Sequence, residues 1–215
     1  MDATQLRKDI LNVSFEAGAC HLGSALSCVE IVLDIHDRMK DRDVFLFAKA
    51  SGVATYYCYL ADKGLFPKEN TADYLRNYPL PSKEVPGVIH SVGSMGHGLS
   101  VAVGLALGDR TRDVYVLLSD GECQEGSTLE AVIFAGHHKL KNLHVFVDDN
   151  QLQAGGATKD ILDLATTFEF MQNTLPNCEI VRTVKGQGVD FMEGDYCWHY
   201  LNLDENLLDK ALQQI

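Results

Sequence analysis

The chain is short of positive charge and has no long apolar segment. Its 215 residues include 18 lysines and arginines against 30 aspartates and glutamates, which gives a formal net charge of −12 at pH 7. This excess of negative charge argues against a nucleic-acid partner and against adhesion to an anionic membrane. No apolar run approaches the roughly 20 residues that span a bilayer, and the acidic start Met1-Asp2 does not resemble a signal peptide.

The cysteines lack the spacing of a disulfide framework, and none of them forms a C-x-x-C pair. Scattered thiols of this kind are typical of a reducing compartment, so we expect a cytoplasmic protein. The six residues are Cys20, Cys28, Cys58, Cys123, Cys178 and Cys197.

Two common nucleotide-binding motifs are also missing. The glycine loop from Gly93 to Gly98 does not continue as G-x-G-x-x-G, because residue 101 is valine, and no G-x-x-x-x-G-K-[ST] sequence occurs. These absences argue against a dinucleotide-binding Rossmann motif and against a P-loop. The segment after the loop is apolar on nearly every side of a helix, which predicts a helix deep in the interior.

The central feature that is present is a β-α-β unit. Val114–Leu118 and Leu143–Val147 are short apolar runs bounded by turn residues, as in strands buried on both faces. Helical periodicity lies between them, with a candidate capping box at Ser127 and Glu130. The unit predicts parallel strands with Asp120 and Asn150 at neighbouring carboxyl ends.

Further segments extend this unit into one α/β domain that covers residues 1–215. We expect a mostly parallel sheet with helices on both faces. Strands are predicted at Asp43–Lys49 and Glu179–Val184, and helices at 4–17, Val53–Lys63, Thr71–Arg76, Leu162–Leu175 and Asn202–Ile215.

The ends of the two central strands offer a set of oxygen ligands. The Asp120 carboxylate, the Asn150 amide oxygen and a nearby backbone carbonyl, assigned to Leu152, suit Mg²⁺ or Ca²⁺ rather than zinc. Gly121 allows backbone to approach an anion closely. Because the chain is acidic, the metal would supply the positive charge that a diphosphate needs.

These residues resemble the thiamine diphosphate motif of the transketolase family, in which Gly-Asp-Gly is followed about thirty residues later by Asn. Three further blocks resemble the N-terminal half of split transketolases, and they lie in the family's order: ACHLGSALS, PGVIHSVGSMGHGLSVAVGLALG and TVKGQGVDFMEGDYCWH. The resemblance covers most of the chain. It implies the thiamine diphosphate-binding (PP-domain) fold, with thiamine diphosphate and Mg²⁺ or Ca²⁺ as cofactors.

The resemblance also implies roles for individual residues. His21 and His199 would exchange protons with substrate hydroxyls, and His90 is a third catalytic candidate. Glu125 would carry a carboxylate network to the partner chain's active site, although by residue type it is equally a first-turn Glu favoured by the helix dipole. The implied cofactor contacts are Ser51, Gly93, Ser94, Met95, Gly121, Glu122, Asn150, Lys185 and His199.

Three departures from the family pattern are visible. Ser119 replaces the first glycine of the motif, and Ser51 replaces the histidine of Gly-His-Gly, which removes a group that can carry a proton near neutral pH. The chain between Gly156 and Lys185 is also short, so one β-α step is missing. We therefore expect a fold shortened toward the C-terminus, with a sheet edge that must be protected in some other way.

The functional expectation is a subunit that holds the diphosphate and metal and works only with a second subunit that carries the pyrimidine-binding domain, as a dimer of such heterodimers. The reaction would transfer a ketol or acyl unit from a ketose or 2-keto acid donor to an aldehyde acceptor. Two alternatives stay open. One is a thiamine-dependent 2-keto acid decarboxylase or synthase subunit of a specialised sugar pathway, and the other is a non-catalytic assembly subunit.

Overall fold

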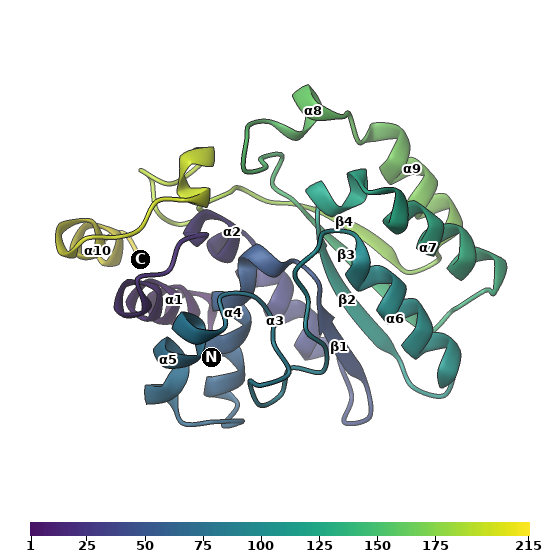
Figure 1. Ribbon diagram of the computed structural model, residues 1–215, viewed down its shortest axis with the longest axis horizontal. Coiled ribbons are helices and arrows are strands. Elements are labelled where there is room, and N and C mark those ends of the chain that lie inside the picture. The colour runs from purple at the N-terminus through teal and green to yellow at the C-terminus, as the bar shows by residue number, and fades with distance from the viewer.

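The core of the protein is a sheet of four parallel strands in the order β1-β2-β3-β4 (Figure 1). The computed structural model describes all 215 residues. The strands are β1 (Val44–Phe47), β2 (Val114–Ser119), β3 (Leu143–Asp149) and β4 (Cys178–Arg182). Each neighbouring pair is parallel, so the predicted α/β fold with a mostly parallel sheet is confirmed.

Both faces of the sheet are buried, which explains the uninterrupted apolar runs in the sequence. On β2, Tyr115 and Leu117 belong to one hydrophobic core, whereas Val114, Val116 and Leu118 belong to a second core on the opposite face. Alternate side chains of a strand point to opposite faces. A strand between two cores is therefore apolar at every position.

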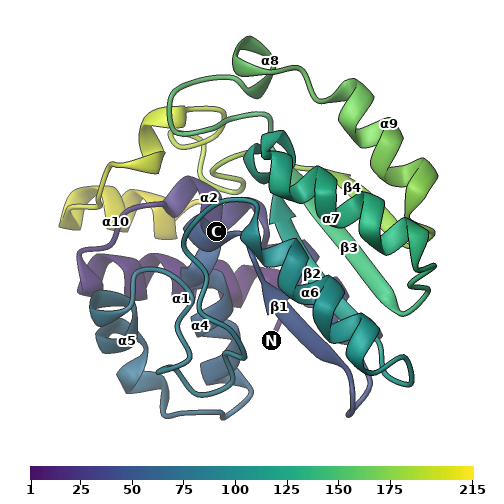
Figure 2. The same cartoon turned by 45° about the vertical axis from the view of Figure 1, so that its right-hand side comes forward.

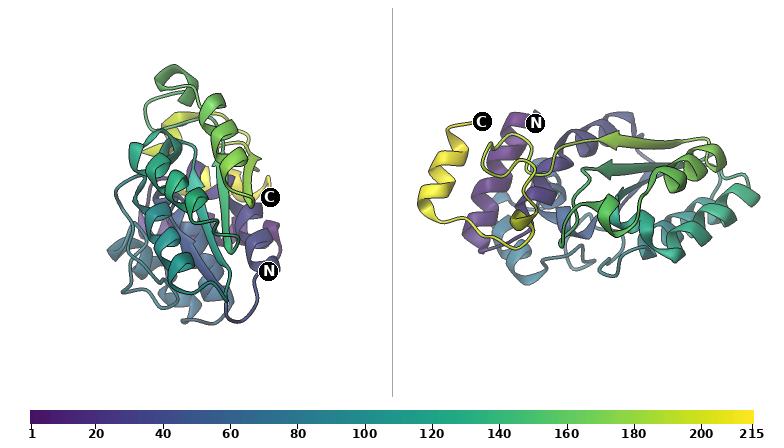
Figure 3. Two further views of the ribbon diagram at one scale, coloured as in Figure 1. Left: turned by 90° about the vertical axis from the view of Figure 1, so that its right-hand side faces the viewer. Right: turned by 90° about the horizontal axis from the view of Figure 1, so that it is seen from above.

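The helices divide into two groups, one for each core (Figures 1 and 2). The first group packs around the N-terminal helix and consists of α1 (Ala3–Ala17), α2 (Leu22–Ser27), α3 (Val29–Arg38), α4 (Val53–Asp62), α5 (Thr71–Asn77) and α10 (Glu205–Leu212). The second group consists of α6 (His97–Gly108), α7 (Gly126–His137) and α9 (Ala165–Thr174), and the short α8 (Thr158–Ile161) precedes α9. Both chain ends lie beside α1 and α10 (Figure 3). No helix combines the length and apolar character that crossing a membrane requires.

The first helix shows how local sequence sets its limits. The Asp2 carboxylate accepts a hydrogen bond from the Gln5 N–H at 2.8 Å, which caps the N-terminus of α1. Gly18 ends the helix with a φ of 63°, a left-handed conformation that glycine adopts without strain. The chain then turns directly into the loop that carries His21.

Two local expectations were wrong. The helix α7 begins at Gly126 with Glu125 in the N-cap position, so Ser127 lies inside the first turn and forms no capping box with Glu130. The helix α6 is not deep in the interior, because Leu107 at its end is 36% exposed. Ile133 and Phe134 on the adjacent α7 are 59% and 45% exposed. Each of these two helices therefore has an exposed face, and the two faces include three large apolar side chains.

The shortened C-terminal part leaves β4 at the edge of the sheet. The strand has five residues and stays partly exposed. Glu179 pairs with Arg38 of α3, and Arg182 pairs with Asp149 of β3. A short strand with charged side chains resists pairing with another chain. The expected protection of the edge is thus supplied by charge rather than by a covering element.

One buried histidine couples the stability of the first core to pH. The ring of His36 on α3 packs against Phe45 and Tyr59, with centroid distances of 4.9 and 4.0 Å, and Nδ1 lies 2.8 Å from the Val32 carbonyl. Burial lowers the pKa of His36 to about 4. An unfolded histidine titrates near 6.5, so between these values the unfolded chain binds more protons than the folded chain. Stability must therefore fall as the pH drops through this window.

We expect His36 to make the protein about 2 kcal/mol less stable at about pH 5 than at about pH 7.5. Urea unfolding at both values, for wild type and for His36→Phe, measures this contribution. The variant should show a weaker pH dependence, whereas His137→Gln, at an exposed position on α7, should behave as wild type. An unchanged pH dependence in His36→Phe would refute the assignment.

Candidate active site at the carboxyl edge of the sheet

Asp120 and Asn150 lie together at the carboxyl ends of neighbouring strands. Asp120 follows β2 and Asn150 follows β3, and these strands pair in parallel up to Ser119 and Asp148. Both side chains line one cavity of about 120 Å³, together with Gly121 and Leu152. The predicted convergence of these residues is therefore confirmed.

The Asp120 carboxylate is buried and joins two loops. It is 2% exposed, and it accepts hydrogen bonds from the N–H groups of Gly121 and Gln151, both at 2.7 Å. Burial, followed by the nearby charge of Asp148, raises the pKa of Asp120 to about 6. A cation beside this carboxylate would offset the unfavourable desolvation.

The amide of Asn150 is held so that its oxygen turns toward the Leu152 backbone. Its Nδ2 donates to Ser27 Oγ at 3.4 Å, and its Oδ1 accepts from the Leu152 N–H at 3.0 Å. The Leu152 carbonyl accepts from Lys185 Nζ at 3.1 Å. The three residues of the predicted metal set, which offer a carboxylate, an amide and a backbone carbonyl, thus line one cavity.

Two buried lysines bring positive charge to this edge. Lys49 Nζ lies 3.1 Å from Asp148 Oδ2, and the two side chains are 1% and 0% exposed. Although burial opposes its charge, the Asp148 carboxylate keeps the pKa of Lys49 above its ordinary value. Burial, and next the charge of Lys49, lowers the pKa of Lys185 to about 8. The two lysines therefore offset the carboxylates of Asp120 and Asp148 at this edge, and Lys185, which forms no ion pair, can meet an anion.

The residues fit a divalent ion bound to a diphosphate. The donors are all hard oxygens, which suit Mg²⁺ or Ca²⁺. No group of three or more His, Cys, Asp and Glu side chains converges in the structure, so the chain offers no complete cage for a metal. An ion held by three protein oxygens would need further oxygens from a ligand, and phosphate oxygens beside Lys49 and Lys185 would supply them.

A second cavity, of about 190 Å³, places two histidines beside this site. His21 and His199 line it, and their rings meet edge to face with centroids 4.6 Å apart. Burial, followed by the charges of Lys49 and Lys185, lowers the pKa of His21. Burial, followed by the charge of Lys185, lowers the pKa of His199 to about 4. Both imidazoles are therefore neutral near pH 7 and can accept a proton from a hydroxyl.

Four other predicted contacts surround this cavity: Ser51, Gly93, Met95 and Glu122. The carboxylate of Glu122 is 2% exposed and accepts from the Ser119 N–H at 2.8 Å and from the Ser119 hydroxyl at 3.1 Å. Burial raises the pKa of Glu122 to about 7. Ser119, which replaces the first glycine of the motif, therefore holds the Glu122 carboxylate in place through two hydrogen bonds.

Four predicted residues line neither of the two cavities: His90, Ser94, Glu125 and Lys185, although Lys185 Nζ reaches the Leu152 carbonyl. His90 and Ser94 belong to the loop before α6 and line neither cavity. Glu125 occupies the N-cap position of α7, where it packs against Gly96: a Cβ on that glycine would lie 2.6 Å from the Glu125 Cβ. Gly96 is thus required for the close approach of the α6 loop to α7.

Polar residues of the site that the sequence did not predict include Ser24, Lys49 and Asp148. Lys49 and Ser24 line the cavity of about 120 Å³ that contains Asp120 and Asn150, here called the metal-side cavity, and Lys49 Nζ donates to the Ser24 carbonyl at 2.6 Å. Two features of the sequence could have indicated these residues. Lys49 ends a predicted buried strand, and Asp148 is the first acidic residue of the Asp-Asp-Asn segment.

The parallel α/β sheet has a cavity at its carboxyl edge that is lined by oxygen-bearing residues and flanked by lysines. These features define a domain of the class that binds an anionic cofactor. A family model described as "Transketolase, thiamine diphosphate binding domain" matches residues 16–190. The chain therefore belongs to the transketolase family and contains its thiamine diphosphate-binding domain.

Two relatives match nearly the whole chain. An apulose-4-phosphate transketolase subunit of Actinobacillus succinogenes is 34% identical over 252 residues, covering 96% of this chain and 91% of the relative. The 6-deoxy-6-sulfo-D-fructose transketolase subunit SqwG of a Clostridium species is 29% identical, covering 99% and 94%. The first alignment is longer than the 215 residues of this chain, so that relative carries residues that this chain lacks.

Solved transketolases share the fold. The enzyme from Campylobacter jejuni superposes with a TM-score of 0.84 at 23% identity, over 99% of this chain and 42% of that one. A transketolase variant from Pichia stipitis gives a TM-score of 0.85 at 19% identity, over 97% and 39%. The chain thus spans about two fifths of these full-length enzymes.

The ion pair between Lys49 and Asp148 provides a test of how this edge is built. Lys49→Met leaves a carboxylate buried without its cation, so we expect the free energy of unfolding to fall by about 3–5 kcal/mol. The double variant Lys49→Met/Asp148→Asn, which removes both charges, should recover at least half of this loss in urea unfolding. Additive losses in the double variant would show that the pair does not act as a unit.

Proposed function

We propose that this chain is the diphosphate-binding subunit of a heteromeric, thiamine diphosphate-dependent, transketolase-like enzyme. One observation carries the proposal: Asp120, Asn150 and Leu152 line a single cavity beside Lys49 and Lys185. The two similar relatives named as transketolase subunits support it. We further propose that residues 1–215 form one domain.

In this proposal the oxygens of Asp120, Asn150 and Leu152 hold Mg²⁺, and Lys185 and Gly121 contact the diphosphate. Ca²⁺ suits the same oxygen ligands. Bound thiamine diphosphate supplies an electron sink for a carbanion, and the protein supplies binding and orientation. The apolar and polar residues of the second cavity, including Gly93, Met95 and Glu122, would exclude water from the cofactor rings.

The two neutral histidines take the proton-transfer roles. In the proposed reaction His21 and His199 exchange protons with donor and acceptor hydroxyls, because each imidazole faces the same cavity and is uncharged at neutral pH. Ser51, which lines the same cavity, can hydrogen-bond to a substrate but cannot act as a base. Proton transfer on this side of the site therefore falls to His21 and His199.

The partner subunit would bring the pyrimidine-binding domain. Leu107 on α6 and Ile133 and Phe134 on the adjacent α7 are exposed large apolar side chains, which supports an assembly with other chains, because exposed apolar surface marks interaction sites. We propose a dimer of heterodimers with Glu125 near the contact between chains. The six free cysteines suit a reducing compartment, and we propose the cytoplasm.

Calorimetric titration with thiamine diphosphate and Mg²⁺ tests the proposal. We expect Asp120→Ala to weaken binding at least tenfold, because substituting residues that only support a metal ligand already lowers metal affinity roughly 10–100-fold. Asp160→Ala, at an exposed position on α8, is the matched control and should bind as wild type. Equal affinity of Asp120→Ala and wild type would refute the metal assignment.

Activity assays with the partner subunit separate the alternatives. Transfer from xylulose 5-phosphate that requires both subunits and is lost in Asp120→Ala supports the transketolase-like reaction. Turnover of pyruvate instead would favour the 2-keto acid decarboxylase or synthase. The specific observation behind this alternative is Ser51, which stands where the family pattern has a histidine that can carry a proton. If Asp120→Ala leaves the partner's activity untouched, the chain is an assembly subunit. Turnover by the isolated chain would end the two-subunit proposal.

A further inference from the structure

The two histidines that line the second cavity are held in different ways. The His199 ring packs edge to face against Tyr200, with centroids 4.9 Å apart, and its Nδ1 lies 3.4 Å from Lys185 Nζ. The His21 ring forms no hydrogen bond with the rest of the chain, and its ring contact is with His199, with centroids 4.6 Å apart. One imidazole is therefore fixed through a ring nitrogen, and the other is not.

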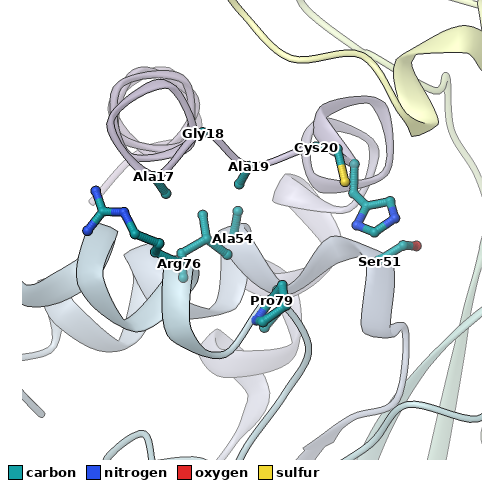
Figure 4. A pocket seen from close by; sticks show the side chains of 11 residues that line it. Ala17, Gly18, Ala19, Cys20, Ser51, Ala54, Arg76 and Pro79 are labelled. Atoms are coloured by element: carbon teal, nitrogen blue, oxygen red, sulfur yellow. The ribbon is translucent and has the colours of Figure 1, made fainter.

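The backbone of His21 is fixed even though its ring is not. The loop from Gly18 to Cys20 leads to this residue (Figure 4). The His21 N–H donates to the His199 carbonyl at 3.2 Å, and the His21 carbonyl accepts from the Ser24 N–H at 3.0 Å. His21 also lines a cavity of about 150 Å³ on the side of this loop. Both ring nitrogens of His21 are therefore available to a bound molecule.

Lys185 supplies the contact that fixes His199. A lysine ammonium has three N–H donors and no acceptor. Three acceptors lie around Lys185 Nζ: the Leu152 carbonyl at 3.1 Å, the Gln153 carbonyl at 3.2 Å and His199 Nδ1 at 3.4 Å. All three are uncharged, so the charge of Lys185 stays available to an anion. Because the ammonium can only donate, His199 Nδ1 is the acceptor in this contact.

The packing around the two side chains keeps them together. Lys185 is 1% exposed, and its stem lies against Gly23 of α2, where an added Cβ would lie 2.9 Å from Lys185 Cγ. His199 ends the short helix η4 (Tyr196–His199), which is anchored by the buried Trp198, whose Nε1 donates to the Phe191 carbonyl at 3.0 Å. The lysine cannot leave the ring unless α2 and η4 repack.

The contact with Lys185 decides the tautomer of His199. Burial, followed by the charge of Lys185, lowers the pKa of His199 to about 4, so the ring carries one hydrogen near pH 7. A hydrogen on Nδ1 would point at the lysine ammonium, and the hydrogen therefore lies on Nε2. In this form Nε2 donates a hydrogen bond and cannot take up a proton. His21 is then the imidazole with a free acceptor nitrogen.

We propose that Lys185 is a positioning residue that fixes His199 in its Nε2–H tautomer, so that His199 acts as a hydrogen-bond donor to substrate oxygen while His21 takes up the hydroxyl proton. The inference rests on the proposed function and narrows it, because it divides the work of the two imidazoles. The substrate O–H bond breaks and an N–H bond forms on His21. The electron pair stays on the substrate oxygen, which accepts a hydrogen bond from His199 Nε2.

Nitrogen NMR on the full chain tests the tautomer without any turnover. Two-bond ¹H–¹⁵N correlation spectra of protein with ¹⁵N-labelled histidine, recorded near pH 7, show which ring nitrogen carries the hydrogen, and His199→Gln identifies the His199 signals. We expect an unprotonated Nδ1 and a protonated Nε2 in the wild type. Lys185→Met should lower the ratio of the Nε2–H form to the Nδ1–H form about tenfold, as loss of a hydrogen bond to a charged group does.

Two further variants separate this effect from a general disturbance of the fold. Lys185→Arg keeps a donor beside Nδ1 and should retain most of the wild-type ratio. Lys159→Met removes an exposed lysine of α8 and should leave the His199 signals unchanged. Melting temperatures identify any variant that fails to fold. The wild-type spectrum decides even then, because a hydrogen on Nδ1 would overturn the proposal by itself, as would an unchanged ratio in a folded Lys185→Met.

Glutamine substitutions test the division of work in the assembled two-subunit enzyme, with xylulose 5-phosphate as donor and glycolaldehyde as acceptor. A glutamine amide donates a hydrogen bond but cannot take up a proton near neutral pH. We expect kcat of His21→Gln to be at least tenfold lower than kcat of His199→Gln, because loss of a general base costs about 10²–10⁴-fold.

The two measurements distinguish failure of this inference from failure of the proposed function. Equal kcat values in the two glutamine variants, or a lower value in His199→Gln, would overturn the division of work while transfer by the wild type keeps the proposed function. Absence of transfer by the wild-type enzyme would refute the proposed function and the role of His199 in it.

Discussion

The buried ion pair between Lys49 and Asp148 is the contact on which the functional edge of the sheet depends. Lys49 follows β1 and Asp148 belongs to β3, so the ion pair spans β2, which lies between them. Its two charged atoms are 3.1 Å apart, and both side chains are buried from water. The same carboxylate accepts from the hydroxyls of Ser27 in α2 and Thr183 after β4. Four segments that are distant in the sequence are thereby held in one position, and Asn150 follows two residues later.

This arrangement also sets the electrostatics of the site. Although burial opposes the charge of Lys49, Asp148 keeps the pKa of Lys49 above its ordinary value, whereas burial lowers the pKa of Lys185 to about 8. Burial, followed by the charges of the two lysines, lowers the pKa values of His21 and His199, so both imidazoles are neutral near pH 7. An acidic protein thus acquires a local region that accepts anions, next to imidazoles that can take up protons. Metal and diphosphate would add opposite charges here, which agrees with a site built for both together.

The sequence predicted the elements whose residues follow a local pattern. It did not predict contacts that depend on how distant segments of the chain pack together. The four strands and the meeting of Asp120 with Asn150 follow from apolar runs and parallel topology. Lys49 and Asp148 each stand at the end of a predicted strand, but nothing in the sequence shows that they form an ion pair, because the pairing depends on tertiary placement. Ser127 and Glu130 match a capping pattern, but the backbone turns into α7 at Glu125. An apolar helix such as α6 can pack in a core or lie at a contact surface, so its sequence alone could not predict which of its side chains are exposed.

The most direct test of the account is a crystal structure of the chain grown with thiamine diphosphate and Mn²⁺, which reports the ion by its anomalous scattering. The account predicts one Mn²⁺ bound by the Asp120 carboxylate, the Asn150 amide oxygen and the Leu152 carbonyl, with the diphosphate on its far side toward Lys185. An ion bound elsewhere, or a diphosphate that occupies the cavity without contact to Asp120 and Asn150, would contradict it.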